Sequence, residues 1–406
     1  MDPFFAELGR AVAEHWKREN FAPEKFPQIA RSALEKKPPA KHVDLAGFMR
    51  DFLLSDQQPA QTDSDFGEPE IVAFKHPRFY IQLLFWLDGT TAIHQHAFSG
   101  AFHVMHGSSI HASYEFENAR AVTDFLHVGD LRMKRIELLE TGRTVPIISG
   151  RQTIHSLFHL DLPSVTVVLR TQHHPGTGPQ FNYLPPRVAI DPLHDDLLSM
   201  RRRQLLGVLE QVEDDGYPEV VTRMIADLDF ESGFHLLRYC MPYLGELGAW
   251  TDVVKTFEKK HKALAAGIET TLREEARRGS IKALRGSIIE PEHRFFLALL
   301  MNAPSRKDLF SLVKQRFPMQ APGDVVLRWV QELMEVSEQG TAILDAVFPE
   351  SLEAALDDQA DLFLSAFAHF SKRDKKMPRS LRDRPAADLK LLRAVFAASA
   401  LGILID

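Results

Sequence analysis

The feature of this sequence that most restricts the fold is a central stretch, from Ile71 to about Pro186, built of short apolar or alternating runs. FYIQLLFWL, SIHASYEF and SVTVVLR are examples, and Gly, Asp, Asn and Pro residues divide one run from the next. Many short strand-like runs at this spacing are typical of antiparallel barrels and sandwiches. We therefore expect a small antiparallel β-barrel or sandwich in the middle of the chain.

Helical patterns flank this centre on both sides. Residues 3–54 and most of residues 194–406 carry apolar side chains at three- and four-residue spacing, as amphipathic helices do. The stretch SDQQPAQTDSDFGEPE at 55–70 is polar and turn-rich, and we interpret it as a linker or exposed loop. The sequence thus predicts an α+β fold, with a barrel between an N-terminal helical segment and a large C-terminal all-α domain. The expected units are residues 1–65 (helical segment and linker), 66–190 (barrel) and 191–406 (helical domain).

Composition limits the classes of function. The chain has 406 residues, of which 45% are hydrophobic and 25% charged, so it can bury a sizeable core. A formal charge of -7 gives no electrostatic basis for binding nucleic acid. The single cysteine, Cys240, excludes an internal disulfide framework and fits a reducing compartment, so we expect a cytoplasmic protein. The N-terminal residues lack a signal-peptide pattern, and no run reaches the roughly 18 apolar residues of a membrane span, so we expect no membrane partner.

The residues best suited to chemistry gather around a His-x-His pair, His94 and His96. Residues i and i+2 of a strand point to the same face, so the two imidazoles would converge on one point, as metal ligands must. The best candidate for a third ligand is His155, in the strand-like run SGRQTIHSLFHLDL. His159 is a rival, because positions four apart on an ideal strand share a face; one would be the ligand and the other would support it.

Histidine is enriched throughout the predicted barrel. Ten of the 18 histidines lie between residues 94 and 174, where an even spread would put about four. Neutral imidazole is a common ligand for Fe(II), Zn, Cu and Ni, and a three-histidine set leaves open positions on the metal. Such a site keeps the full charge of the ion and favours anionic ligands such as thiolate, enolate or carboxylate. The sequence therefore predicts a three-histidine metal centre.

A motif of a known family surrounds the histidine pair. The run GTTAIHQHAFSGAFHVMHG, from Gly89 to Gly107, resembles the first cupin motif, in which a glycine precedes an H-x-H pair and a second glycine follows. His155, at the end of TVPIISGRQTIH, resembles the histidine of the second cupin motif. Within the cupins, FYIQLLFWLDGTTAIHQH is most similar to the cysteine dioxygenase type of thiol dioxygenases, which hold non-heme iron through three histidines. The resemblance covers about residues 70–175, and it implies that the central unit is a cupin-type, jelly-roll-like antiparallel β-barrel.

This resemblance implies a ligand set and a reaction. By it, His94, His96 and His155 would be the iron ligands, and Gly100 stands where many cupins place a fourth, glutamate ligand. Loss of that carboxylate is expected of a three-histidine dioxygenase. The resemblance also implies dioxygen as a co-substrate and a small substrate that binds beside the metal.

The sequence departs from that family in the residues that handle substrate. The family's serine-histidine-tyrosine relay would fall on Thr166, Val168 and Arg170, so the relay is missing. His159 stands where the second motif often has asparagine. The candidates for a cation that holds the negative charge of the substrate are Arg170 and Lys75. We therefore expect catalytic roles for Arg170, His159 and Lys75, on a substrate that need not be cysteine.

The leading hypothesis is an Fe(II)- and dioxygen-dependent oxygenase acting on a small anionic substrate, with thiols as candidates. Three imidazoles also accept Zn, Mn, Ni or Cu, so the ligand set alone leaves the metal open. An alternative is a non-catalytic metal- or ligand-binding cupin module coupled to the helical domain, which would then contact a protein partner or a second copy of the chain. A zinc or manganese cupin isomerase is a third hypothesis, which shares the ligands but not the dependence on oxygen.

Overall fold

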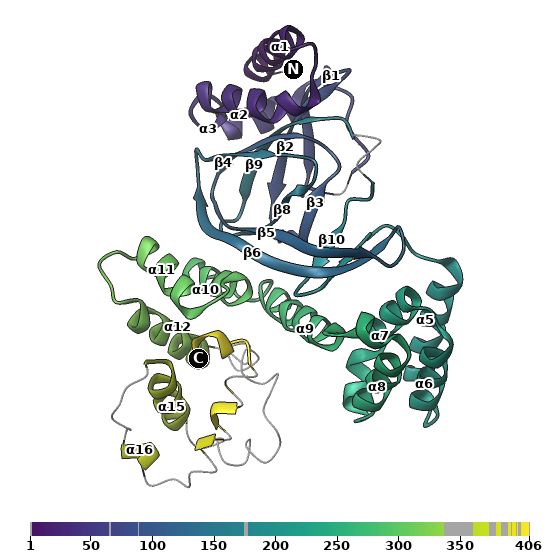
Figure 1. The fold of residues 1–406 in the computed structure, drawn as a ribbon. Helices are drawn as coiled ribbons and strands as arrows, with labels where there is room; N and C mark the ends of the chain where they lie inside the picture. Colours follow the sequence, from purple (N-terminus) through teal and green to yellow (C-terminus); the bar gives the residue numbers. More distant parts are fainter. Residues whose placement is uncertain are drawn as a thin grey trace.

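The chain folds into a β-barrel with helices on two sides (Figure 1). This arrangement confirms the expected α+β fold, with an antiparallel β-barrel between two helical regions. None of the described helices is long and apolar enough to cross a membrane. The structure, a computed structural model, describes residues 2–64, 66–87, 89–173, 178–336, 360–372, 379–382, 389–390, 392–394, 396 and 399–405.

The N-terminal helices cover one face of the barrel (Figure 1). The first helix begins after Asp2, whose carboxylate caps it by accepting a hydrogen bond from the backbone N–H of Phe4 at 2.8 Å. Its apolar face, which includes Phe5 and Trp16, packs in one cluster with Phe79 and other side chains on the outer face of the sheet. The helical elements of this segment are α1 (Pro3–Arg18), η1 (Pro23–Lys25), α2 (Phe26–Lys36), α3 (Pro39–His42) and α4 (Leu45–Leu54).

The barrel consists of antiparallel strands in two groups. The first group forms a sheet of order β1-β2-β9-β4-β7, and the second, in the order β10-β11-β6-β5-β8-β3, closes on itself. The strands are β1 (Glu70–His76), β2 (Phe79–Trp86), β3 (Ile93–His96), β4 (Gly100–His106), β5 (Ser108–Ala121), β6 (Leu126–Glu140), β7 (Thr144–Ile147), β8 (Gly150–His159), β9 (Ser164–Thr171), β10 (Asn182–Leu184) and β11 (Val188–Ile190).

The central strands β2 and β9 are buried on both faces, which explains why their sequences are almost continuously apolar. One face packs against the N-terminal helices. The other lines the barrel interior, because successive side chains of a strand point to opposite faces. The interior-facing residues are Gln82, Leu84 and Trp86 on β2, and Thr166, Val168 and Arg170 on β9.

The region after the barrel is helical, as expected. The predicted helical pattern of residues 337–359 lies outside the described residues. The described elements are α5 (Leu197–Gln211), α6 (Tyr217–Asp227), α7 (Phe230–Glu246), α8 (Trp250–His261), η2 (Lys262–Ala265), α9 (Ile268–Leu284), α10 (Pro291–Asn302), α11 (Arg306–Arg316), α12 (Pro322–Val336), α15 (Ala360–Lys372), α16 (Arg379–Arg382) and η3 (Gly402–Leu404).

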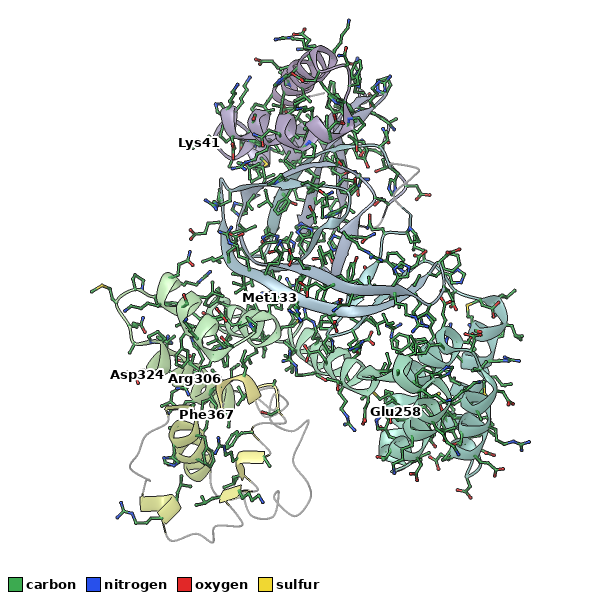
Figure 2. All side chains as sticks on the ribbon, in the orientation of Figure 1. Lys41, Met133, Glu258, Arg306, Asp324 and Phe367 are labelled. Atoms are coloured by element: carbon green, nitrogen blue, oxygen red, sulfur yellow. The ribbon has the colours of Figure 1, made fainter. Side chains whose placement is uncertain are left out.

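The helical region shares an apolar core with the barrel. Ile110 of β5, Leu138 of β6 and Phe158 of β8 belong to the same buried cluster as Phe296 of α10. Figure 2 shows side chains filling the space between β6, where Met133 lies, and the helices next to it. The division of the chain at residues 190 and 191 therefore stays a prediction, since packing is continuous across it.

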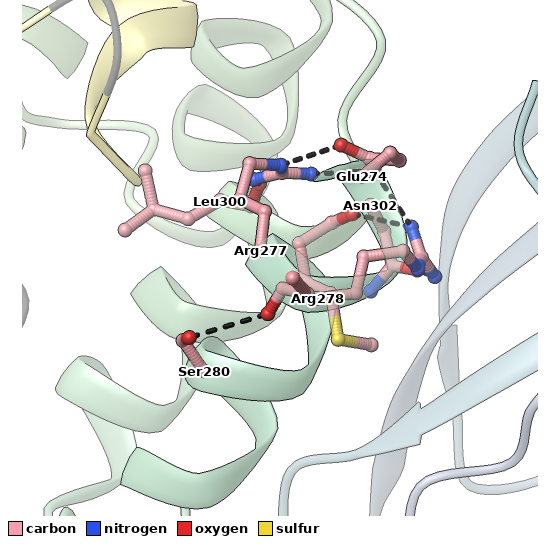
Figure 3. A network of polar contacts seen from close by, with 8 residues as sticks. Glu274, Arg277, Arg278, Ser280, Leu300 and Asn302 are labelled. Carbon is pink, nitrogen blue, oxygen red and sulfur yellow. Dashed lines mark hydrogen bonds and ion pairs between the residues drawn. The ribbon is translucent and has the colours of Figure 1, made fainter. Parts of the chain in front are cut away.

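Charged side chains join α9 to the end of α10 (Figure 3). The guanidinium of Arg277 donates to the carbonyl of Leu300 at 3.0 Å and is held by Glu274 at 2.7 Å. Arg278 donates to Oδ1 of Asn302 at 3.2 Å. The last carbonyls of a helix have no partner within the helix, so cations there stabilise it. These bonds fix α9 against α10.

Arg285, directly after α9, connects the helical region to the loop that precedes β3. Its side chain is buried, lies over the ring of Phe158, and donates to the carbonyl of His159 at 2.9 Å. It also donates to the carbonyl of Gly89 and to Oγ1 of Thr90. A buried guanidinium with several acceptors is a rigid connection, because each acceptor would lose its partner if the side chain moved.

Replacement of Arg285 by leucine should lower the free energy of unfolding by about 3 kcal/mol, because one buried and two partly buried acceptors lose their donor. The matched control is Lys282→Ala, which changes an exposed residue one turn earlier and should cost less than about 0.5 kcal/mol. Urea unfolding followed by tryptophan fluorescence measures both variants. Equal unfolding midpoints for the two would contradict the role given to Arg285.

Candidate metal centre

The pairing of β3 with β8 brings three histidines together. In this register His94 lies opposite His155, and an irregularity follows between Gln95 and His96. His94, His96 and His155 are buried, and their candidate ligand atoms all lie within 4.8 Å of one another. The structure therefore places together the three residues that the sequence suggested.

The hydrogen bonds of His94 leave one of its ring nitrogens available as a ligand. Nδ1 lies 2.9 Å from the carbonyl oxygen of Ala92, which can only accept, so Nδ1 carries the proton. Nε2 then has a free lone pair, and this buried atom has no hydrogen-bond partner among the described residues. A histidine whose other nitrogen is bonded in this way is the usual form of a metal ligand.

His96 and His155 face one another closely. Their Nε2 atoms are 2.8 Å apart, which requires either a proton or a cation between the two lone pairs. On its other side, Nδ1 of His155 lies 3.0 Å from Nε2 of His111, and Nδ1 of His111 lies 3.3 Å from a carboxylate oxygen of Glu137. The donor set and its spacing fit a metal ion bound by Nε2 of His155 together with the other two imidazoles.

Burial keeps the three imidazoles neutral. It is the largest cause that lowers the pKa of His94, and the bond to Ala92 only partly opposes it. For His96 the pKa lies well below its ordinary value because of burial and then the charges of His94 and Arg170. For His155, burial comes first and the neighbouring histidines add to it. Neutral imidazole is the form that binds metal, so the cluster is ready to bind at neutral pH.

A cavity of about 40 Å³ adjoins the three histidines. Its walls are mainly apolar and include Phe98 and Phe102, while Arg170 and Gln82 contribute polar groups in addition to those of histidine and threonine. Both side chains are buried. Nη2 of Arg170 and Oε1 of Gln82 have no hydrogen-bond partner among the described residues. Buried polar atoms without partners are rare and indicate a missing ligand or water.

Arg170 is held in place by aromatic rings. Its guanidinium carbon lies 3.4 Å from the ring centroid of Phe98 and 5.1 Å from that of Tyr80. Its Nε donates to the carbonyl of Thr171 at 3.4 Å. These contacts fix the plane of the guanidinium but do not neutralise its charge, so the cavity contains a cation suited to an anionic group.

The structure does not bring the other two predicted catalytic residues to the cluster. Lys75 is exposed on β1, and its ammonium lies 3.4 Å from the carbonyl of Ala60, away from the cavity. His159 is buried, stacks on Trp86 with ring centroids 4.5 Å apart, and has Nδ1 2.9 Å from the hydroxyl of Ser109. Trp86 lines the cavity and His159 does not, so His155 is the histidine of β8 that joins the cluster. Catalytic roles for Lys75 and His159 remain predictions without support from their positions.

Sequence reasoning missed two residues that line the cavity. Gln82 is the polar residue in the apolar run FYIQLLFW, and that contrast was the signal that it faces a functional interior. Phe66, in the stretch interpreted as a linker, lies 5.9 Å from His94 between ring centroids and also contacts Trp86. Its stretch is fixed to β2 by a hydrogen bond of 2.7 Å from Glu68 to the carbonyl of Phe85.

No protein-family model and no curated protein sequence matches this chain. Solved structures resemble about a third of this chain. A cupin-2 domain-containing protein from Shewanella frigidimarina is 16% identical, with a TM-score of 0.19 over 32% of this chain and 96% of that chain. Hydroquinone 1,2-dioxygenase from Sphingomonas sp. TTNP3, solved with 4-hydroxybenzoate, is 12% identical, with a TM-score of 0.22 over 30% of this chain and 84% of that chain. Similarity at this level carries no information about chemistry. The site is therefore defined by its own contacts, as a buried three-histidine cluster suited to a metal ion in an antiparallel β-barrel.

Replacement of the two histidines of β8 should separate their roles. His155→Gln should weaken binding of Co(II) or Zn(II) by more than about 100-fold, beyond the cost of losing a supporting residue. His159→Gln should change it by less than about 2-fold, because its ring is stacked away from the cluster. Competition titration with a chelator measures both dissociation constants. The reverse order would make His159 the third ligand.

Acid should destabilise the fold in part through His103 of β4. Burial lowers its pKa to about 4, against about 6.5 in the unfolded chain. The folded state then binds fewer protons, so the contribution is complete above about pH 6.5 and is lost as the pH falls toward 4. Between pH 7 and pH 4.5 the loss should be about 2 to 3 kcal/mol. His103→Gln should flatten this dependence by that amount in urea unfolding, and parallel pH profiles would contradict it.

Proposed function

We propose that the barrel is a metal-dependent oxygenase, which binds Fe(II) through His94, His96 and His155 and oxidises a small anionic substrate with dioxygen. The observation that carries this proposal is the buried guanidinium of Arg170. It lines the same cavity as the three neutral imidazoles, and its Nη2 has no hydrogen-bond partner in the described part of the chain. A metal site beside a separate unpaired cation suits a substrate with a negative group at a distance from its reacting atom.

The ligand set supports this chemistry. An ion held by three neutral histidines would keep its full positive charge, attract an anionic substrate atom and leave positions open for dioxygen. The choice of iron rests on the resemblance of residues 79–96 to the thiol dioxygenase type, and on Gly100 at the position of the fourth ligand. A thiol-bearing acid is accordingly the first substrate class to test. Zn, Mn, Ni and Cu fit the same donors.

The residues of the chain would bind, orient and shield the substrate. Arg170 would form a charge-assisted hydrogen bond with a carboxylate, and the rings of Phe98 and Tyr80 already hold its plane. The amide of Gln82 would bind a second polar group, since its Oε1 has no partner in the described structure. The apolar walls exclude water, which strengthens these interactions. Orientation of this kind is a large part of catalysis.

The size of the cavity favours a second candidate function. About 40 Å³ holds one or two water molecules, so a substrate would enter only if a wall such as Phe66 moved. A barrel that binds a metal and does not turn over would need no such movement. The alternative is thus a non-catalytic metal-binding module, coupled to the helical region that shares its core.

Metal content and oxygen uptake decide between these functions. Protein purified without added metal should contain near-stoichiometric iron by mass spectrometry, and His94→Ala should contain none. The iron-loaded protein should consume oxygen with at least one member of a panel of small thiols and carboxylic acids. Bound metal without oxygen uptake on any of them would favour the non-catalytic module, and no metal in either protein would remove the centre.

Arg170→Gln should raise KM for an anionic substrate by about 10- to 100-fold, the effect of losing a hydrogen bond to a charged group. Lys75→Gln is the matched control, because it removes a cation of the same barrel that is exposed and does not line the cavity. Its KM should stay within about 2-fold of the wild-type value. An unchanged KM for Arg170→Gln would show that Arg170 does not bind the substrate charge.

A further inference from the structure

A line of hydrogen bonds leads from His155 out of the cavity across neighbouring strands. The strands β6, β5, β8 and β3 are adjacent in the closed group, and they carry Glu137, His111, His155 and His94 in that order. Glu137 is directly opposite His111 in the register of β5 and β6. His111 reaches His155 across β5 and β8, at 3.0 Å between Nε2 and Nδ1.

We propose that His111 and Glu137 are positioning residues, which hold His155 in the tautomer and orientation of a metal ligand. This inference rests on the proposed metal centre, and it assigns to that centre a carboxylate-histidine relay behind one of its ligands. Both residues lie within the stretch covered by the resemblance described above, but the resemblance assigns a role to neither of them.

The direction of the hydrogen bonds follows from the carboxylate. Glu137 can only accept when ionised, so the proton of His111 is on Nδ1, at 3.3 Å from the carboxylate oxygen. With its one proton on Nδ1, His111 presents a lone pair at Nε2, and His155 donates to it from Nδ1. The lone pair of His155 is thereby fixed at Nε2, the atom that faces His96. The opposite direction would put a proton on Nε2 of His155 and prevent it from binding a metal.

Glu137 is itself held in the ionised form. A hydrogen bond from His111 is the first cause that lowers the pKa of its carboxyl group, and the charges of Arg135 and Arg143 add to it. Arg135 lies 2.6 Å from the carboxylate and Arg143 lies 3.9 Å from it. The carboxylate also borders a cavity of about 390 Å³ between β6 and α11, so the outer end of the relay lies next to the helical region.

The relay distinguishes His155 from the other histidines of the barrel. Nδ1 of His94 donates to the backbone carbonyl of Ala92, and Nδ1 of His96 has no partner among the described residues. The buried His103 has a neutral hydroxyl, Oγ1 of Thr144 at 2.8 Å from its Nδ1. A carboxylate behind a ligand raises the basicity of the imidazole and fixes its ring, which a carbonyl or hydroxyl does less strongly.

The first test compares metal affinity in three variants. His111→Phe keeps an aromatic ring beside Phe102 but removes the acceptor of His155, and it should weaken Co(II) binding by about 10- to 100-fold. Glu137→Gln keeps an accepting oxygen without its charge and should weaken binding less, by below about 10-fold. Glu140→Gln is the control, because it removes an exposed carboxylate of the same strand. Its dissociation constant should match that of the wild type.

The second test reads the tautomer and the ligand field directly. In the metal-free wild-type protein, long-range nitrogen-proton NMR spectra of labelled histidine should show His155 with its proton on Nδ1. The visible spectrum of the Co(II) form should shift in His111→Phe and in Glu137→Gln but not in Glu140→Gln. A purely structural role of the pair would leave this spectrum unchanged in Glu137→Gln, which preserves the shape of the side chain.

Separate outcomes overturn the relay and the metal centre. Wild-type protein that binds neither Co(II) nor Zn(II) would overturn the centre and the relay together. Wild-type protein that binds both ions, with the same affinity and Co(II) spectrum in Glu137→Gln and His111→Phe, would overturn the relay alone. If His111→Phe does not fold, as judged by circular dichroism, Glu137→Gln and the tautomer of wild-type His155 still decide the inference.

Discussion

The candidate site depends above all on the register between β3 and β8. A slip of one residue would turn the side chains of a strand to its other face, and the cluster would be lost. β3 has only a few residues, so this register is fixed from outside. Gln95, between the two histidines, receives a hydrogen bond of 2.5 Å from the hydroxyl of Tyr183 and donates to the carbonyl of Pro179 at 2.9 Å. These bonds hold the side chain of Gln95 away from the imidazoles of His94 and His96.

The electrostatics of the cavity explain why its polar groups belong together. Burying several imidazoles, an amide and a guanidinium among aromatic side chains costs free energy unless each finds a partner. Nε2 of His94, Oε1 of Gln82 and Nη2 of Arg170 have no partner among the described residues, and all three residues line one cavity. A cation at the histidines and an anion at the arginine would satisfy both ends at once. A metal ion and an anionic ligand are therefore complementary occupants, and neither alone accounts for all of these atoms.

Much of this arrangement could be predicted from local sequence. Strand periodicity was enough to predict the barrel, and the His-x-His spacing was enough to predict that His94 and His96 share a face. The second strand-like run indicated His155 as the third residue. The choice between His155 and His159 could not be made, because residues four apart share a strand face. At about 3.3 Å per residue, His155 and His159 are about 13 Å apart along the strand, so only one of the two can reach the cluster. His159, at the other position, stacks its ring on that of Trp86.

Apart from Gln82, whose signal was local, the residues that sequence reasoning missed depend on long-range register. His111 and Glu137 are neighbours only because β5 and β6 pair at that point, 26 residues apart in the chain. Phe66 reaches His94 because the polar stretch before β1 is bonded to β2 instead of leading away from the barrel. No spacing rule within one segment predicts such contacts. Arg170 was found because a charge at the end of an apolar run is a local signal.

The helical region contributes to the site through the loop that leads into β3. Arg285 holds Gly89 and Thr90. The next residue, Thr91, is fixed to Leu157 of β8 by bonds of 2.9 Å and 2.7 Å. The carbonyl of Ala92, which follows, sets the tautomer of His94. The loop is thus tied at one end to the helices and at the other to β8, so the orientation of His94 depends on contacts from both sides. A side chain of the helical region that does not line the cavity can in this way influence which nitrogen of His94 is free to bind a metal ion.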